Sequence, residues 1–416
     1  MVTTPNPDRW LTAGRLRAHA MVIALCLWSV YVWTLATPGL RDRNGNVKGT
    51  DFLHLYTLGS LALERRGADL YNMEAQDAVV AARVPQASGV RYLPLYPPQV
   101  AIFFMPLAAL SYSWALAAWW ALSIAIYGLC CFKIWRACPN LLDYRSVVAI
   151  AAIAFPGFFH LIAWGQTSAL ALAGFTLMFF LLREQRDFAA GLVLGLLIFK
   201  PQLGLAAAIV FGGIGAWKIL AGAVFSAAAE LGVGVLYFGL APVRQWIVTL
   251  ENVRSVLPWL EPRPYQTHSL RTFWFMLIAW HNLALVLYIV STLTILALTV
   301  AIWRHKPRIP LALRYSALLL ATVLVAPHLT VYDLVILAPV FLLMADWLLG
   351  QGEKSRPRSW GTLLYFIYVL PLLAPLVRWT HVQYSVIAMG AAVCVIYSRT
   401  RQSVNEKSAV PVAAAS

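Results

Sequence analysis

Long apolar runs separated by short polar stretches make up most of this chain. A membrane-crossing helix needs about 20 mainly apolar residues. The runs that reach or approach this length are residues 18–38, 112–135, 146–162, 167–183, 187–200, 203–218, 219–240, 284–303, 312–327, 331–349, 360–377 and 382–398. Residues 98–111 and 269–281 fit further short or re-entrant helices. The pattern predicts an all-α polytopic membrane protein with about ten to thirteen transmembrane helices.

Composition supports this prediction. The chain has 416 residues, of which 61% are hydrophobic and 12% charged, and its mean hydropathy is +0.71. Soluble domains are about half apolar and a quarter charged. We expect residues 1–400 to form one multi-span domain and residues 401–416 to be a disordered cytoplasmic tail.

The net charge of +15 arises from short basic clusters between the apolar runs, not from a basic domain that would bind nucleic acid. Lysine and arginine concentrate in cytoplasmic loops. The clusters taken as cytoplasmic are Lys133 with Arg136 and Arg145, Arg183 with Arg186, Lys218, Arg304 to Arg314, Lys354 to Arg358, and Arg399 with Arg401. The N-terminus carries Arg9, Arg15 and Arg17 and is expected to lie in the cytoplasm. We expect the apolar run that follows to be a first helix that is retained in the protein.

With the basic clusters inside, nearly all remaining polar stretches fall on the opposite membrane face. These are the first outer loop, residues 38–98, a second outer loop, residues 241–271, and the segments around His160, Lys200, His328 and Arg378. The sequence therefore predicts one extracytoplasmic active-site cavity built from many helix ends.

Asp51 is the leading candidate for catalysis. It begins the stretch "DFLHLYTLGSLALERRGADLYN" in the first outer loop. Leucines at helical spacing predict an amphipathic helix along the membrane surface, with Asp51 and His54 on one face. Glu64, Arg65 and Arg66 fit the solvated side of this interfacial helix. Asp51 is interpreted as a general base that accepts a proton from a substrate hydroxyl. The alternative is a carboxylate that only stabilises the helix start.

A second group of residues is interpreted as the binding set for a phosphate. Lys200, in "FKPQLG", lies on the non-cytoplasmic side against the positive-inside trend, and a phosphate is its natural partner. Arg91 and Arg271 are candidates for the same phosphate. Snorkelling of Lys200 to the interface is the alternative.

Further polar residues at the predicted outer helix ends are candidates for substrate binding: His54, Tyr96, Gln166, Gln202, His268, His328 and Asp333. Gln166 lies in "WGQTS", where a helix cap at Thr167 or Ser168 is the competing interpretation. A structural pair of His328 with Asp333 is the alternative for "APHLTVYD". The chain has no His-Glu-x-x-His motif, no Cys/His cluster at ligand spacing and no Walker A loop, so neither a metal nor a cofactor is expected.

An ordered set of segments resembles glycosyltransferase family 87, which includes the mycobacterial phosphatidylinositol-mannoside mannosyltransferases. The segments are the Asp51 stretch followed by "YLPLYPPQVAIFFMPLAAL", "GQTSALALAGFTLMFFLL", "AGLVLGLLIFKPQLGL" and "APHLTVYDLVILAPV". The resemblance implies a GT-C fold with an outer-face site and a polyprenyl-phosphate sugar donor. It also implies catalysis by Asp51 and a role for His328, although the paired histidines of the mycobacterial members are missing here.

These observations predict an inverting glycosyltransferase that moves a sugar, mannose by the resemblance, from polyprenyl phosphate to a hydroxyl of a lipid or glycan acceptor. The expected location is the bacterial inner membrane, with the site facing the periplasm or exterior. Two alternatives from other classes are a transporter or flippase of lipid-linked sugars and a structural assembly subunit. A transporter needs polar access from both faces, whereas the polarity here gathers on one.

Overall fold

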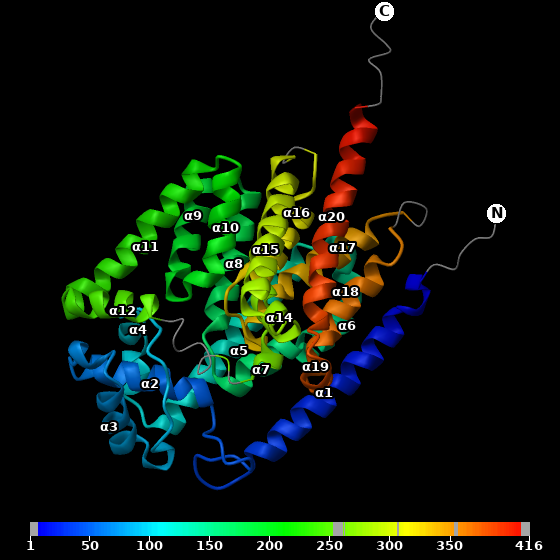
Figure 1. Ribbon diagram of the computed structural model, residues 1–416. Helices are drawn as coiled ribbons and strands as arrows, with labels where there is room; N and C mark the ends of the chain where they lie inside the picture. The colour runs from blue at the N-terminus through cyan, green and yellow to red at the C-terminus, as the bar shows by residue number, and fades with distance from the viewer. Residues whose placement is uncertain (1–6, 253–260, 262, 306–307, 353–356, 409–416) are drawn as a thin grey trace, which may run out of the picture.

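The computed structural model describes residues 7–252, 261, 263–305, 308–352 and 357–408, and most of this part is helical (Figure 1). The α-helices are α1 (Ala13–Leu35), α2 (Thr50–Leu63), α3 (Met73–Arg83), α4 (Gln99–Ala108), α5 (Tyr112–Arg136), α6 (Arg145–Ala154), α7 (Pro156–Trp164), α8 (Ser168–Arg183), α9 (Asp187–Gly195), α10 (Pro201–Gly213), α11 (Trp217–Phe238), α12 (Ala241–Glu251), α14 (Leu270–Leu277), α15 (His281–Arg304), α16 (Leu311–Val325), α17 (Ala338–Leu349), α18 (Trp360–Val369), α19 (Ala374–Thr380) and α20 (Tyr384–Ser408).

Short 3-10 helices connect or extend these elements: η1 (Pro7–Trp10), η2 (Gly67–Asp69), η3 (Pro85–Ala87), η4 (Pro139–Tyr144), η5 (Leu196–Phe199), η6 (Pro264–Gln266), η7 (Val331–Leu337) and η8 (Leu370–Leu373). The all-α prediction is confirmed for the described residues.

Within the described residues, six stretches are long and apolar enough to cross a membrane: α1, α5, α11, α15, η7 with α17, and α18 through α19. A seventh forms if η4 and α6 are joined to α7 across a bend of 43°. Proline begins α7 and the preceding residue, Phe155, is extended, as residues before proline tend to be. Five shorter apolar helices accompany them: α4, α8, α9 with η5, α10 and α16. These helices support the membrane assignment, while the number of spans and the GT-C arrangement stay predictions.

Helix α16 forms the centre of the bundle. Every residue from Leu313 to Val325 is buried, and α16 contacts α10, α15, α17 and α20. A mainly apolar helix of this kind is stable only when neighbours enclose it. Helix α16 therefore fixes the arrangement of the longer helices around it.

Glycines allow α9 and α11 to approach closely. A Cβ atom added at Gly191 would lie 2.0 Å from the carbonyl oxygen of Ile219, and one at Gly195 would lie 2.1 Å from that of Ala223. Helices in membranes use small residues in this way, because van der Waals contact replaces the hydrophobic effect as the driving force.

Helices α2, α3, α4 and α12 gather at one end of the molecule, at the lower left of Figure 1. The structure differs here from the predicted interfacial helix. Helix α2 is buried from Phe52 to Ala62 and packs against α4, because Gly59 leaves room for the Phe104 backbone, whose oxygen would lie 2.6 Å from a Cβ atom. Glu64 and Arg65, beyond the end of the helix, are exposed.

Helix α20 extends to Ser408, so residues 401–408 of the segment expected to be disordered are helical, and residues 409–416 lie outside the described part. The second outer loop contains α12 and η6, and its residues 253–260 and 262 also lie outside the described part.

Candidate active site

Asp51 is hydrogen-bonded to Gln166. It lies in the first turn of α2, directly after Thr50. The residue before Thr50, Gly49, has a left-handed backbone conformation. The Gln166 side-chain amide donates to Oδ2 of Asp51 at 2.6 Å, and the Tyr96 hydroxyl donates to Oε1 of Gln166 at 3.0 Å. Three of the residues predicted to line the cavity therefore come together from three separate segments.

The turn between α7 and α8 positions Gln166. Gly165 has a φ of +67°, a conformation that glycine adopts without steric cost. A Cβ atom there would lie 2.8 Å from that of Phe52 on α2, and the indole of Trp119 donates to the Gly165 carbonyl at 2.9 Å. Glycine thus allows this turn to lie directly against the start of α2.

The surroundings of Asp51 adjust its acidity. Burial raises the pKa of Asp51 to about 6, while the Gln166 hydrogen bond and the charge of Lys200 act in the opposite direction. A carboxylate with a pKa near the working pH is well suited to general base catalysis. At neutral pH most Asp51 side chains are ionised and able to accept a proton.

A second centre is the buried ion pair between Lys200 and Asp333. The Lys200 ammonium lies 2.8 Å from Oδ1 of Asp333 and donates to Oγ of Ser168 at 3.1 Å. Lys200 and Asp333 are only 5% and 2% exposed, and the Tyr332 ring centroid lies 4.9 Å from the ammonium. The Asp333 carboxylate also accepts from the Thr330 backbone in a capping box at the start of η7. Asp333 is therefore both a helix cap and the counter-ion of Lys200.

The segment Gln166–Thr167–Ser168 connects the two centres. Gln166 bonds Asp51, and the Ser168 hydroxyl, two residues later, donates to Asp333. The Tyr96 hydroxyl lies 3.4 Å from Oγ1 of Thr167. The competing interpretation of this segment as a plain helix cap is not supported, since neither Thr167 nor Ser168 caps α8 through its side chain.

A third cluster contains Glu261, which the sequence interpretation did not select. Oε1 of Glu261 accepts from Arg271 at 3.0 Å and lies 2.9 Å from Nδ1 of His328. Burial acts to raise the pKa of Glu261, but hydrogen bonds and charge from His328 and Arg271 outweigh it and lower the pKa. His328 thus pairs with Glu261 and not with Asp333, unlike the structural pair considered from the sequence.

A family comparison defines the chemistry of this chain. The model of glycosyltransferase family 87 matches residues 95–327, more than half of the chain. The chain belongs to glycosyltransferase family 87. It is therefore an enzyme that transfers sugars. No curated protein and no solved structure matches the chain significantly.

The residues matched by the family model include only part of the candidate active site. Tyr96, Gln166 and Lys200 lie inside the matched residues, whereas Asp51 precedes them and Asp333 follows them. The geometry of this glycosyltransferase joins the matched and unmatched parts through the Gln166–Asp51 and Lys200–Asp333 contacts.

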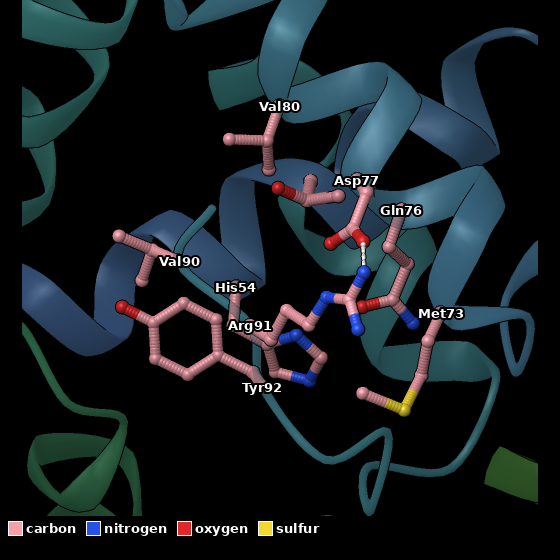
Figure 2. A pocket seen from close by; sticks show the side chains of 9 residues that line it. His54, Met73, Gln76, Asp77, Val80, Val90, Arg91 and Tyr92 are labelled. Carbon is pink, nitrogen blue, oxygen red and sulfur yellow. Dashed lines mark ion pairs between the residues drawn. The ribbon is translucent and has the colours of Figure 1, made fainter. Parts of the chain in front are cut away.

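His54 lines a small pocket together with residues of α3 and of the segment before α4 (Figure 2). Its ring lies between those of Tyr92 and Tyr96, with centroids 5.4 and 5.9 Å away, and both ring nitrogens are buried without a hydrogen-bond partner. Burial lowers the pKa of His54 to about 4, so the ring is neutral. Arg91 lines the same pocket and pairs with Asp77 at 2.7 Å. Arg91 thus contacts Asp77 instead of joining Lys200.

Two remaining candidates of this glycosyltransferase make no described contact with Asp51 or Lys200. Nδ1 of His268 lies 2.7 Å from the Ser385 hydroxyl, and its buried Nε2 has no hydrogen-bond partner. Gln202 is half-buried in the first turn of α10, two residues after Lys200. The structure therefore joins most of the predicted residues into three centres and leaves Arg91, His268 and Gln202 outside them.

Ser168 and Glu261 are the residues of the site that the sequence interpretation missed. Ser168 was considered only as a possible cap, although its place in a polar turn between two apolar runs marked it as a candidate. Glu261 lies between prolines and other polar residues in the second outer loop and has no periodic signal. Among the described residues, no three His, Cys, Asp or Glu side chains form a group that would hold a metal ion.

Proposed function

We propose that this glycosyltransferase moves a sugar from a polyprenyl-phosphate donor to a hydroxyl of a lipid or glycan acceptor, with inversion, at the outer face of the bacterial inner membrane. Mannose is the proposed sugar, following the resemblance to mannosyltransferases. The observation that carries the proposal is the Asp51 carboxylate, held by Gln166 next to the Lys200–Asp333–Ser168 centre.

Asp51 acts as the general base. As an acceptor hydroxyl loses its proton to the carboxylate, its oxygen forms a bond to the anomeric carbon from the face opposite the phosphate. The bond between the anomeric carbon and the phosphate oxygen breaks, and polyprenyl phosphate leaves with the electron pair. This leaving group is already a stable anion, so the reaction needs no strong general acid. A positioned base contributes about 10²- to 10⁴-fold to such a step.

Lys200 holds the donor phosphate. An ammonium has three N–H donors, and Asp333 and Ser168 accept two of them in this structure. The third is available to a phosphate oxygen. Asp333 keeps the buried lysine charged, because an unpaired buried ammonium tends to lose its proton. Arg271 would contribute a second positive charge from its pair with Glu261.

The pocket beside His54 receives a single hydroxyl group of the acceptor, because its volume of about 10 Å³ is that of one water-sized group. Its neutral imidazole offers one donor and one acceptor nitrogen, a combination that suits a sugar or polyol hydroxyl. Arg91 and Asp77 provide further polar atoms at this pocket, and Tyr92 supplies a ring face (Figure 2). His54 lies one helical turn from Asp51 on the same side of α2, so a bound hydroxyl would lie close to the base.

The test is transfer by the purified, reconstituted enzyme from a labelled polyprenyl-phosphate mannose donor in the presence of membrane lipid acceptors. We expect release of polyprenyl phosphate and a labelled glycolipid or glycan. The variant Asp51→Asn preserves size and should lose about 10²- to 10⁴-fold in kcat. Asp69→Asn, which affects an outer-loop carboxylate paired with Arg66, is the matched control and should retain activity.

Movement of the intact donor across vesicles without release of polyprenyl phosphate would instead identify a flippase. Near-normal turnover by well-folded Asp51→Asn would remove Asp51 from the mechanism. Transfer from glucose or arabinose donors but not from mannose would overturn the proposed sugar and leave the role of Asp51 intact.

A further inference from the structure

An apolar cavity of about 460 Å³ lies between the first helix and the rest of the bundle. Most of its lining comes from α1, α6, α17 and α18, with smaller contributions from α5 and η4. Figure 1 shows α1 running along the side of the molecule next to α6. On α1 the lining positions include Leu16, His19, Ala20 and Ile23, which recur at helical spacing. Ala20 is the only described residue of α1 that is fully buried. The interface between α1 and the bundle, called the seam below, therefore contains this cavity and is only partly packed.

The cavity has the length of one membrane leaflet. Along α17 its lining extends from Ala338 to Leu349. Eleven steps at a rise of about 1.5 Å give about 16 Å. The hydrocarbon core of a bilayer is about 30 Å thick, so one leaflet contributes about 15 Å. An acyl chain that enters from the lipid fits this length.

The cavity lies at the end of the helices away from the candidate active site. One end of its lining is at Ala338 and Phe155, and Ala338 follows Asp333 by five residues, directly after η7. From there the lining of α17 continues to Leu349, away from Asp333, and its other end is at Asp8 and Gly361. The ligand of this cavity is therefore separate from the substrates of the Asp51 centre.

Basic residues adjoin the lining at the end of the cavity near Asp8 and Gly361. Arg15 and Arg17 flank Leu16 on α1, and Arg145, the first residue of α6, follows the lining residue Tyr144. Asp8, an acidic residue at this end, already accepts hydrogen bonds from the Thr362 backbone at 2.9 Å and its hydroxyl at 2.7 Å. The arrangement suits a ligand with an apolar chain and an anionic head.

We propose that this cavity binds one acyl chain of an anionic phospholipid from the leaflet opposite the active site, with the headgroup near Arg15, Arg17 and Arg145. The bound lipid fills the seam and fastens α1 to the bundle. This inference is independent of the proposed transfer reaction. A ligand that binds only the folded protein raises its stability according to its concentration relative to the dissociation constant.

The test compares phosphatidylglycerol with phosphatidylcholine of identical acyl chains, added to delipidated full-length protein in detergent. Native mass spectrometry counts bound lipid, and thermal unfolding reports stabilisation. For the wild type we expect one retained phosphatidylglycerol and an increase in Tm of several degrees, with a smaller effect from phosphatidylcholine. The double variant Arg15→Gln/Arg145→Gln should lose the preference for the anionic lipid, whereas Arg304→Gln, an exposed control at the end of α15, should keep it.

A second variant fills the cavity itself. Ala345→Phe on α17 places a ring in the cavity and should weaken phosphatidylglycerol binding about tenfold, or about 1.4 kcal/mol. Ala221→Phe, the same change at an exposed position of α11, should leave binding unchanged. Equal effects of the two phospholipids on the wild type would overturn the proposal, as would equal binding by the two phenylalanine variants. Extraction of an isoprenoid lipid from the cavity would also overturn it, by identifying the occupant as the chain of a donor.

Discussion

Gln166 determines how the proposed base is presented. Its amide donates to Asp51 at 2.6 Å while its carbonyl oxygen accepts from Tyr96 at 3.0 Å, so the orientation of the side chain is fixed from both ends. The hydrogen bond favours the ionised carboxylate and opposes the effect of burial. Gln166 is therefore a positioning residue that acts through Asp51, although the sequence suggested only that it lines the cavity.

Replacing Gln166 with leucine removes this donor. The pKa of Asp51 should then rise above about 6. Because the base works only when ionised, activity falls as the pH drops through this pKa, and a raised pKa moves the acid limb of the profile to higher pH. We expect a shift of about one unit in the pH dependence of kcat/KM. Gln245→Leu, at an exposed position of α12, should show the wild-type profile. An unchanged acid limb with a uniformly lower rate would show that Gln166 has no influence on Asp51.

Lys200 and Asp333 form a pair whose members depend on each other. Lys200→Met leaves a buried carboxylate without its counter-ion, and Asp333→Leu leaves a buried ammonium. Breaking one side of such a pair costs about 3 to 5 kcal/mol, whereas replacing both sides with apolar groups costs much less. The Tm of each single variant should therefore be lower than the Tm of the double variant. Donor binding should be lost in Lys200→Met and in the double variant, because both lack the lysine. Strictly additive losses of stability would argue against a coupled pair.

At the scale of elements, the close approach of α9 and α11 depends on glycine. Gly191→Ala introduces a Cβ atom 2.0 Å from the backbone oxygen of Ile219, and backbone cannot move aside cheaply. We expect a decrease in Tm of several degrees. Gly128→Ala, within α5 and with no atom within 4 Å of the added Cβ, is the matched control. It should be neutral or stabilising by up to about 1 kcal/mol, since alanine is the better helix former. If both variants unfold at the same temperature, the helices are not in tight contact.

The helices themselves were largely predictable, because apolar length and proline or glycine breaks are local properties of the sequence. The environment of α2 was not. Its leucines and polar residues predicted a helix with one solvated face, but Gly59 allows α4 to cover it. The same difference applies to the site. Asp51 and Lys200 stood out as charges next to apolar runs, whereas the role of Ser168 depends on Asp333, 165 residues away.

At the scale of the whole molecule, the three polar centres join segments that are far apart in the chain. Asp51 in the first outer loop, the turn at Gln166, the helix break at Lys200 and the capping box at Asp333 converge at one end of the helical bundle. The cavity beside α1 lies along α17, the helix that follows η7 and Asp333 in the chain. The separation of the polar centres from the apolar cavity suits an enzyme whose reaction takes place on one membrane face. The orientation of the chain in the membrane is therefore the property that decides where the reaction occurs.

The basic clusters predict that the turn after α8 lies in the cytoplasm and that the loop containing α2 and α3 lies outside. In a background with all five cysteines replaced, Ser88→Cys tests the outer loop and Glu184→Cys tests the turn after α8, and both positions are exposed. A membrane-impermeant maleimide should label Ser88→Cys on intact cells and Glu184→Cys only after the membrane is opened. The reverse result would place Asp51 in the cytoplasm. A donor presented at the outer face would then be out of reach, and the proposed reaction would need a cytoplasmic donor instead.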